Sequence, residues 1–150
     1  MVGMLDDRDR AILRALQEDA RATYAQIGEA VGLAVSTVHD RIRKLEQGGA
    51  IRAYRADVDP EPLGLFVTAL VSVMPLDPTQ PDDLPDRVRE FDEVEACHSV
   101  AGDENYILKV RTRTTSDLEE FLRRLREKAG VQTRTTVVLS TPFENRPIVP

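Results

Sequence analysis

A change in the spacing of apolar residues near residue 60 constrains the fold of this 150-residue chain more than any other sequence feature. Before the change, apolar residues recur every three or four positions, which is the period of an amphipathic α-helix. After it, apolar runs typical of β-strands are interrupted by two helical stretches. Asp59, Pro60 and Pro62 lie at the change and are typical of a linker. We therefore predict two domains, residues 1–60 and residues 61–150.

The first domain is predicted to hold three short helices. Their signals are Asp6 or Asp7 at the start and Glu18 at the end of the first, a Thr23–Gln26 capping box and Gly32 for the second, and Gly48 and Gly49 after the third. A two-turn helix, a tight turn at Gly32 and a longer basic helix form the pattern of a helix-turn-helix. Residues 50–58 partly alternate and predict a short strand before the linker.

The second domain is predicted to follow the order βαββαβ. The predicted elements are strands at 65–74, 94–101, 105–112 and 131–140, and helices at 82–91 and from Ser116, where Ser116 and Glu119 have capping-box spacing. This order is the split arrangement of ferredoxin-like folds, so the fold class is α+β.

The first strand of the second domain is apolar on both faces. Val67, Val71 and Val73 alternate with Phe66 and Leu70. Two helices cover only one face of a four-stranded sheet, and exposing the other would forfeit several kcal/mol at ~25 cal/mol per Å² of apolar area. We therefore predict that a second subunit packs on the open face, giving at least a homodimer. The alternative is a half-exposed sheet that tolerates a few apolar residues.

The net charge of −6 argues against a generic nucleic-acid binder, but its distribution is uneven. Residues 1–60 hold nine Lys and Arg against ten Asp and Glu, and residues 61–150 hold eleven against sixteen. Residues 41–55 carry five cations and only one carboxylate, Glu46. A basic stripe on the third predicted helix therefore stands against an acidic background.

The outward face of the third predicted helix is polar, because Val38, Ile42 and Leu45 share the opposite face at 100° per residue. In a helix-turn-helix the first outward residues of the second helix of the motif reach base edges, and later cations hold phosphates. The predicted DNA-binding residues are Ser36, Thr37, His39 and Asp40 for bases and Arg41, Arg43, Lys44 and Arg52 for phosphates. Asp40 either accepts from a cytosine amino group or lies too close to phosphates and weakens binding. The alternative is a solvated face of mixed charge.

Two segments resemble the Lrp/AsnC (feast/famine) family of transcription regulators. Residues 5–64 are similar to its DNA-binding domain, and Leu65 to Leu139, with AGDENYILKV and TRTTVVL, to its ligand-sensing domain. The resemblance implies a winged helix-turn-helix, binding to double-stranded operator DNA, a response to amino acids, and homodimers that often assemble as tetramers of dimers. Ala34 stands where relatives often have serine, so the third helix lacks a side-chain N-cap.

The resemblance also implies an effector site. It places the effector near the turn formed by Gly102, Asp103, Glu104, Asn105 and Tyr106, and in several members near the last strand, where Thr133 and Thr135 match a T-x-T motif. An acidic, glycine-bearing turn offers acceptors for an ammonium and backbone N–H groups for a carboxylate. Asn105 replaces the family's usual aspartate. The same residues also suit a plain hairpin turn, and the two threonines either line a pocket or face the helices.

Several other classes are disfavoured by the sequence. No apolar run reaches the ~18 residues of a membrane span, and the acidic start is unlike a secretory signal, so we expect a cytoplasmic protein. One cysteine, Cys97, and two histidines predict no disulfide, metal site or cofactor. Sirohaem decarboxylases share this architecture, but His98 is the only histidine of the second domain and no catalytic constellation is evident. We expect no enzyme. A ligand-sensing module without DNA binding is the other alternative.

Overall fold

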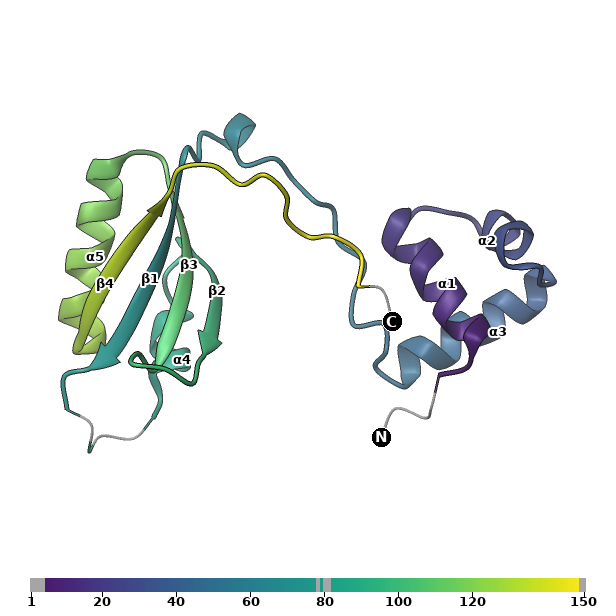
Figure 1. The fold of residues 1–150 in the computed structure, drawn as a ribbon, viewed down its shortest axis with the longest axis horizontal. Coiled ribbons are helices and arrows are strands. Elements are labelled where there is room, and N and C mark those ends of the chain that lie inside the picture. Colours follow the sequence, from purple (N-terminus) through teal and green to yellow (C-terminus); the bar gives the residue numbers. More distant parts are fainter. Residues whose placement is uncertain (1–4, 78, 80–81, 149–150) are drawn as a thin grey trace. The chain divides into compact units, whose positions relative to one another are not determined.

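The computed structural model describes residues 5–77, 79 and 82–148. It divides into two compact units, one made of Met1–Asp57 with Phe143–Pro150 and one made of Val58–Pro142 (Figure 1). The units differ from the predicted domains mainly in the C-terminal residues, which belong with the first unit. The outer ends of both predicted domains, residues 1–4 and 149–150, lie outside the described residues.

The first unit is the predicted trio of helices. Its elements are α1 (Asp7–Glu18), α2 (Tyr24–Val31) and α3 (Val35–Gln47). The side chains of Asp6 and Asp9 form a capping box at α1, and those of Thr23 and Gln26 form one at α2. Gly32 ends α2 with a φ of 69°, a conformation that favours glycine. As expected, no side chain caps the start of α3 at Ala34.

The core of the first unit is small and joins all three helices. Its buried members are Ile12, Leu16, Ile27, Val38, Ile42 and Leu45. The last three lie on α3 at positions i, i+4 and i+7, so that a single face of α3 is buried and the opposite face is turned outward.

The predicted strand at residues 50–58 is wrong. This segment has no regular secondary structure and makes no ladder pairing among the described residues. A strand needs a neighbouring strand to satisfy its backbone groups, and the described part of the first unit contains only helices and irregular segments. The partial alternation of the sequence was therefore a misleading signal, and this unit forms the helix-turn-helix without a paired wing strand.

The second unit confirms the βαββαβ order. Its elements are the 3₁₀ turn η1 (Glu61–Leu63), β1 (Val67–Pro75), α4 (Leu84–Val88), β2 (Val94–Ser99), β3 (Tyr106–Thr112), α5 (Thr115–Ala129) and β4 (Val131–Val138). The four strands form one antiparallel sheet in the order β2-β3-β1-β4. Both helices lie on the same face of this sheet (Figure 1).

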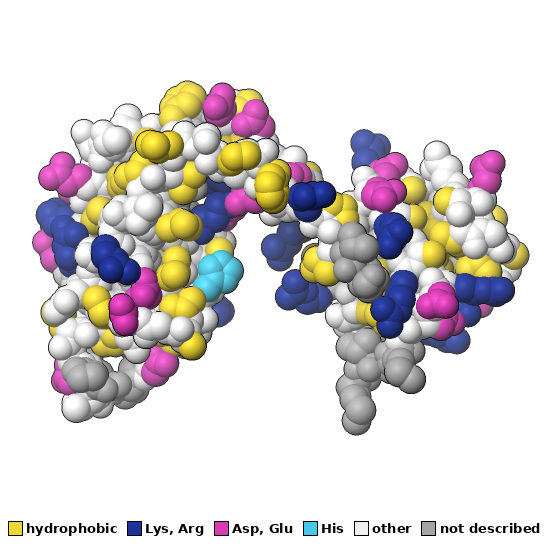
Figure 2. All heavy atoms as spheres, in the orientation of Figure 1, with side chains coloured by type: hydrophobic (Ala, Val, Ile, Leu, Met, Phe, Trp, Pro, Cys, Tyr) yellow, Lys and Arg dark blue, Asp and Glu magenta, His cyan; other side chains and the backbone are white. Residues whose placement is uncertain are grey.

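The core of the second unit lies between the sheet and its helices. Ala69, Val71 and Val73 of β1 are fully buried there, next to Leu108 and Val110 of β3. The other face of the sheet is open in this chain: Leu70 is 41% exposed and Phe66, just before β1, is 69% exposed. Hydrophobic and charged side chains are mixed on the visible face of this unit (Figure 2).

Two helix predictions in the second unit need correction. The N-cap of α5 is Thr114, which forms its capping box with Asp117, so the predicted Ser116–Glu119 box is wrong. The two patterns overlap in the sequence, and the helix starts at the earlier one. Helix α4 covers only Leu84–Val88 and is shorter than the predicted helix at 82–91. Asp83, just before it, provides no side-chain cap. Phe91 packs in the core but lies after the end of the helix.

Candidate DNA-binding surface and effector site

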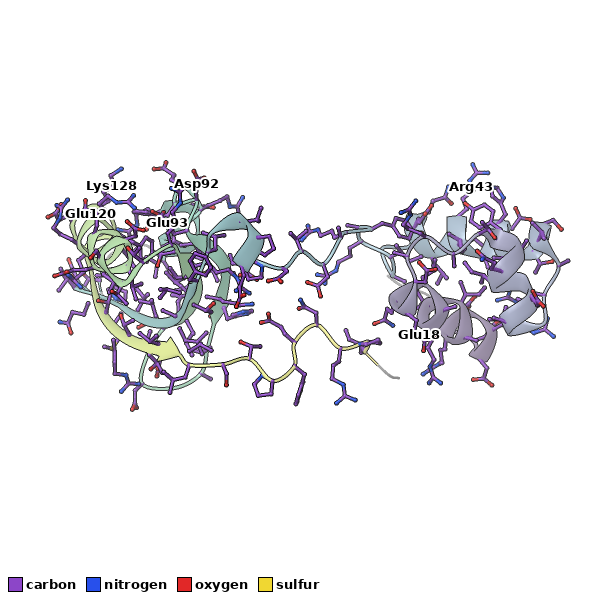
Figure 3. The ribbon with its side chains drawn as sticks, turned by 90° about the horizontal axis from the view of Figure 1, so that it is seen from above. Glu18, Arg43, Asp92, Glu93, Glu120 and Lys128 are labelled. Carbon is purple, nitrogen blue, oxygen red and sulfur yellow. The ribbon has the colours of Figure 1, made fainter. Side chains whose placement is uncertain are left out.

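The outward face of α3 carries most of the predicted DNA-binding residues. Ser36, His39, Asp40, Arg43 and Lys44 are exposed, while Thr37 is half-buried at the flank. Arg43 lies on the outer side of the helix (Figure 3). The buried apolar face of α3 fixes this orientation, because turning the helix would bring charges into the core.

Three cations near the end of α3 and just after it have no side-chain partner in the part of the chain that the structure describes. Among the described residues, the side chains of Arg43, Lys44 and Arg52 make no hydrogen bond and no ion pair. Arg52 lies beyond α3, on the irregular segment that follows it. Three unpaired cations close together in the sequence can bind phosphates without first giving up an internal carboxylate.

Arg41 differs from the other predicted phosphate contacts. Its Nη1 atom donates to Asp6 Oδ2 at 2.8 Å and to Asp9 Oδ1 at 2.7 Å. The Asp9 backbone N–H and the Arg41 guanidinium lower the pKa of Asp6, and the two carboxylates raise the pKa of Arg41. Arg41 therefore ties α3 to the start of α1 in this structure, and its phosphate contact remains a prediction.

Two aromatic residues that the sequence analysis did not select lie beside this surface. The Tyr24 ring packs edge-on against the His39 ring, with 5.4 Å between centroids, and His39 Nδ1 lies 3.4 Å from Asp40 Oδ1. Tyr54 donates to Glu46 Oε1 at 2.9 Å, and burial followed by this bond raises the pKa of Tyr54 to about 12. The contacts position His39 and restrain the segment after α3.

Gly28 is a further residue that the sequence analysis missed. A Cβ at this position would lie 2.6 Å from the Leu33 carbonyl oxygen, and the Leu33 N–H donates to the Gly28 carbonyl at 2.9 Å. The turn between α2 and α3 thus passes directly against the α2 backbone. Only a residue without a side chain permits this approach, which sets the position of α3.

The predicted effector turn is anchored to the open face of the sheet by Glu104. Glu104 Oε1 accepts from Ser72 Oγ at 2.7 Å and from Arg134 Nη2 at 3.0 Å. These two partners, Ser72 first, lower the pKa of Glu104. Gly102, Asp103 and Asn105 are exposed, and the Asn105 N–H donates to the Val73 carbonyl at 3.2 Å.

The remaining predicted effector residues lie on the helix-covered face. Tyr106 is buried and donates to Asp82 Oδ1 at 2.8 Å, and this bond, together with burial, raises the pKa of Tyr106. Thr133 accepts from Arg126 of α5 at 3.2 Å, and Thr135 is opposite the buried Val71. The turn and these threonines therefore share one end of the sheet but present side chains on two faces.

Other chemistries find no site in the described part of the chain. No group of three His, Cys, Asp or Glu side chains is placed there to hold a metal ion. Cys97 is half-buried, and burial raises the pKa of its thiol. None of the described helices has the length and apolar character needed to cross a membrane.

Comparison with known proteins gives matches over almost the whole chain. The family model of the AsnC-type helix-turn-helix domain matches residues 5–46, and that of the Lrp/AsnC ligand binding domain matches residues 67–148. The HTH-type transcriptional regulator LrpA of Mycobacterium tuberculosis is 44% identical over 146 residues, 97% of each chain.

Solved structures agree with these matches. The feast or famine regulatory protein Rv3291c of M. tuberculosis, complexed with L-methionine, is 44% identical with a TM-score of 0.96 over 98% of this chain and 100% of that one. A transcriptional regulator of Neisseria meningitidis in complex with L-methionine is 28% identical with a TM-score of 0.87, over 97% of this chain and 96% of that one.

Proposed function

Since the chain belongs to the Lrp/AsnC family of DNA-binding transcriptional regulators and is not an enzyme, we propose that it reads operator DNA with the outward face of α3. The observation that carries this assignment is that, within the described residues, the Arg43 and Lys44 side chains have no partner and lie beside exposed polar residues on a helix whose opposite face is buried. Such a face has the shape and charge to enter a major groove.

The residues on this face divide into two roles. Ser36, Thr37, His39 and Asp40, near the start of α3, contact base edges, and Arg43, Lys44 and Arg52 anchor phosphates. Arg41 joins them by exchanging its two carboxylate partners for a phosphate. Asp40 favours a cytosine, because its carboxylate accepts from the cytosine amino group.

Titration of the chain with its own promoter region tests the DNA proposal. We expect saturable binding that resists excess unrelated DNA and weakens as salt rises, measured by mobility shift and fluorescence anisotropy. Equal affinity for promoter and unrelated DNA at ~0.15 M salt would contradict operator recognition. It would favour the alternative of a sensing module without specific DNA binding.

We propose that the effector is an amino acid or a related small molecule bound at the turn of residues 102–106. Gly102 and Asp103 are exposed residues whose backbone N–H groups suit the effector carboxylate, and the Glu104 carboxylate suits its ammonium. Two relatives are solved with L-methionine, which makes methionine the first candidate. Thr133 and Thr135 lie on the helix-covered face of β4, so they contribute to the effector site by holding β4 in position and not by direct contact.

Calorimetric titration with each of the twenty amino acids tests the effector proposal. Glu104→Gln removes a negative charge and is expected to weaken binding about tenfold. Asn105→Asp adds the negative charge that the family resemblance implies at this position and is expected to strengthen binding. Heat from no amino acid, with an intact fold, would show that the chain senses another molecule or none.

We also propose that the chain forms a homodimer through the open face of the sheet, with a tetramer of dimers as a larger form, in the cytoplasm. Phe66, just before β1, and Leu70, on β1, are exposed apolar side chains, and such side chains support a subunit contact on the open face of the sheet. Sedimentation analysis is expected to give a dimer or larger, and Leu70→Lys is expected to shift it toward monomer. A monomeric wild-type chain at micromolar concentration would overturn this proposal.

A further inference from the structure

The C-terminal residues connect the second unit to the first unit a second time. They follow β4, which ends at Val138, yet Phe143–Pro150 belong to the same compact unit as α1, α2 and α3 (Figure 1). The chain therefore passes between the units once near residue 58 and again near residue 142. The C-terminal residues are not among the proposed DNA-binding residues or the proposed effector residues.

The described C-terminal residues are held to α1 by a paired hydrogen bond. The Ile148 N–H donates to Gln17 Oε1 at 2.7 Å, and Gln17 Nε2 donates to the Ile148 carbonyl at 3.2 Å. A carboxamide that bonds both backbone groups of one residue imitates the partner strand of a sheet, and it fixes the direction of the bound chain as well as its position.

Asn145 provides a second attachment and a bend. Its φ of 52° is the only positive value at a non-glycine among the described residues, and asparagine tolerates this region better than most residues. Its Nδ2 atom donates to Asp57 Oδ1 at 3.3 Å, on the segment that follows α3. Pro142 and Pro147 limit the conformations of the free segment, which lowers the entropy lost when it docks.

The docked segment forms part of the wall of a groove of about 830 Å³ on the first unit. Residues of α1, including Leu13 and Gln17, line one side of it, and residues after α3, including Ile51 and Arg52, line another, together with Asn145 and Ile148. The C-terminal segment thus touches both α1 and the stretch that carries a proposed phosphate contact. The groove is not lined by the residues of α3 that we propose to contact bases.

We propose that residues 143–148 form a strap that docks against α1 and the segment after α3, and that it thereby restricts the orientation of the first unit relative to the end of β4. The inference rests on the proposed dimer. Two DNA-binding units on one dimer bind two half-sites, and their effective concentration at the second half-site depends on how far each unit is free to turn. A docked strap narrows that freedom without contacting DNA.

Two point variants and one shortened chain test the strap with two readouts. Gln17→Ala removes both bonds to Ile148, a chain ended after Pro142 removes the strap, and Glu18→Gln is a neighbouring exposed change on α1 that leaves the bonds in place. The first readout is the rate at which the protease Glu-C cuts after Glu144. The second is the affinity for DNA with two half-sites compared with DNA carrying one.

We expect Gln17→Ala to be cut about tenfold faster than wild type and Glu18→Gln to match wild type, since two modest hydrogen bonds hold the segment. Gln17→Ala and the shortened chain are expected to lose about tenfold in affinity for two half-sites and less than twofold for one. Unchanged cleavage of Gln17→Ala overturns the docking. Faster cleavage with unchanged two-site affinity overturns the role of the strap.

Sedimentation of the wild-type chain separates this inference from the proposed dimer. If the chain is a monomer, the dimer proposal fails and the two-site readout has no meaning. The cleavage rates of Gln17→Ala and Glu18→Gln then decide the docking alone.

Discussion

Arg43 and Lys44 of the first unit differ in their surroundings from several cations of the second unit. On α3 of the first unit, the side chains of Arg43 and Lys44 have no partners among the described residues. In the second unit, Lys109 and Arg111 both bond Glu95, and Arg134 bonds Glu104. Two arginines of α5 are similarly engaged, since Arg123 bonds Glu120 and Glu127 and Arg124 bonds Glu93.

This difference shows why the net charge of −6 was a poor guide to binding. The field of a paired cation is largely offset by its carboxylate partner, whereas no neighbouring carboxylate offsets the field of an unpaired cation, which is therefore available to a phosphate. The first unit therefore offers a surface for an external anion. The second uses the same residue types to hold its own sheet and helix together.

The largest expected effect is on the scaffold that presents the free cations. Gly28→Val places a side chain within 2.6 Å of the Leu33 carbonyl, and we expect it to destabilise the first unit by about 3 kcal/mol and to abolish DNA binding. Thermal unfolding followed by circular dichroism should show that helical signal is lost at a lower temperature than in the wild type, while the second unit stays folded. Ala30→Val, an exposed change on α2, is the control and should cost under about 0.7 kcal/mol.

The next prediction compares the two sets of cations directly. Arg43→Ala with Lys44→Ala is expected to lower operator affinity 10- to 100-fold and to reduce the slope of log affinity on log salt by about two per subunit, at about one per phosphate contact. The matched variant, Arg123→Ala with Arg124→Ala on α5, removes the same charge from two cations that bond carboxylates and should change affinity less than about threefold. Similar losses in both variants would mean that only net charge matters.

A third prediction concerns pH and the paired carboxylates of the second unit. Burial raises the pKa of Glu95, but hydrogen bonds from Lys109 and Arg111 outweigh it and leave the pKa lowered. A lowered pKa means that the stabilisation is full above the unfolded value of about 4.3 and is lost as pH falls through the folded value.

Thermal unfolding between pH 7 and pH 3 checks this expectation. The melting temperature of the second unit should fall below about pH 4, and Glu95→Gln should remove part of that fall. The part removed should correspond to less than about 1 kcal/mol of unfolding free energy, because Glu95 is partly exposed. A pH profile identical in wild type and variant would show that the Glu95 pairs contribute nothing.

The smallest expected effect lies at the segment after α3. Tyr54→Phe removes the bond to Glu46 and should cost under about 1 kcal/mol. Ultraviolet titration should show a tyrosine with a pKa of about 12 that is absent from the variant. Since the folded pKa is raised, its small stabilisation is lost between about pH 10 and pH 12. Loss of an ordinary tyrosine signal instead would contradict the Tyr54–Glu46 bond.

Local sequence patterns predicted most of the fold because they report local physics. The caps at Asp6 and Thr23, the stop at Gly32 and the stripe of Val38, Ile42 and Leu45 all depend on neighbours within seven residues. The strand at residues 50–58 failed because a strand also needs a partner, which no local pattern contains. The start of α5 failed because two capping patterns overlap.

Which charges are free was decided by tertiary structure. The sequence by itself determined the helix-turn-helix, the βαββαβ order and the polar outward face of α3, because hydrophobic period and capping chemistry specify them. It did not show that Arg41 is taken by Asp6 and Asp9, that Glu104 bonds Arg134, or that Ile148 bonds Gln17. Those pairs join residues 30 or more positions apart, and only packing of the folded chain brings their charges and amides within reach.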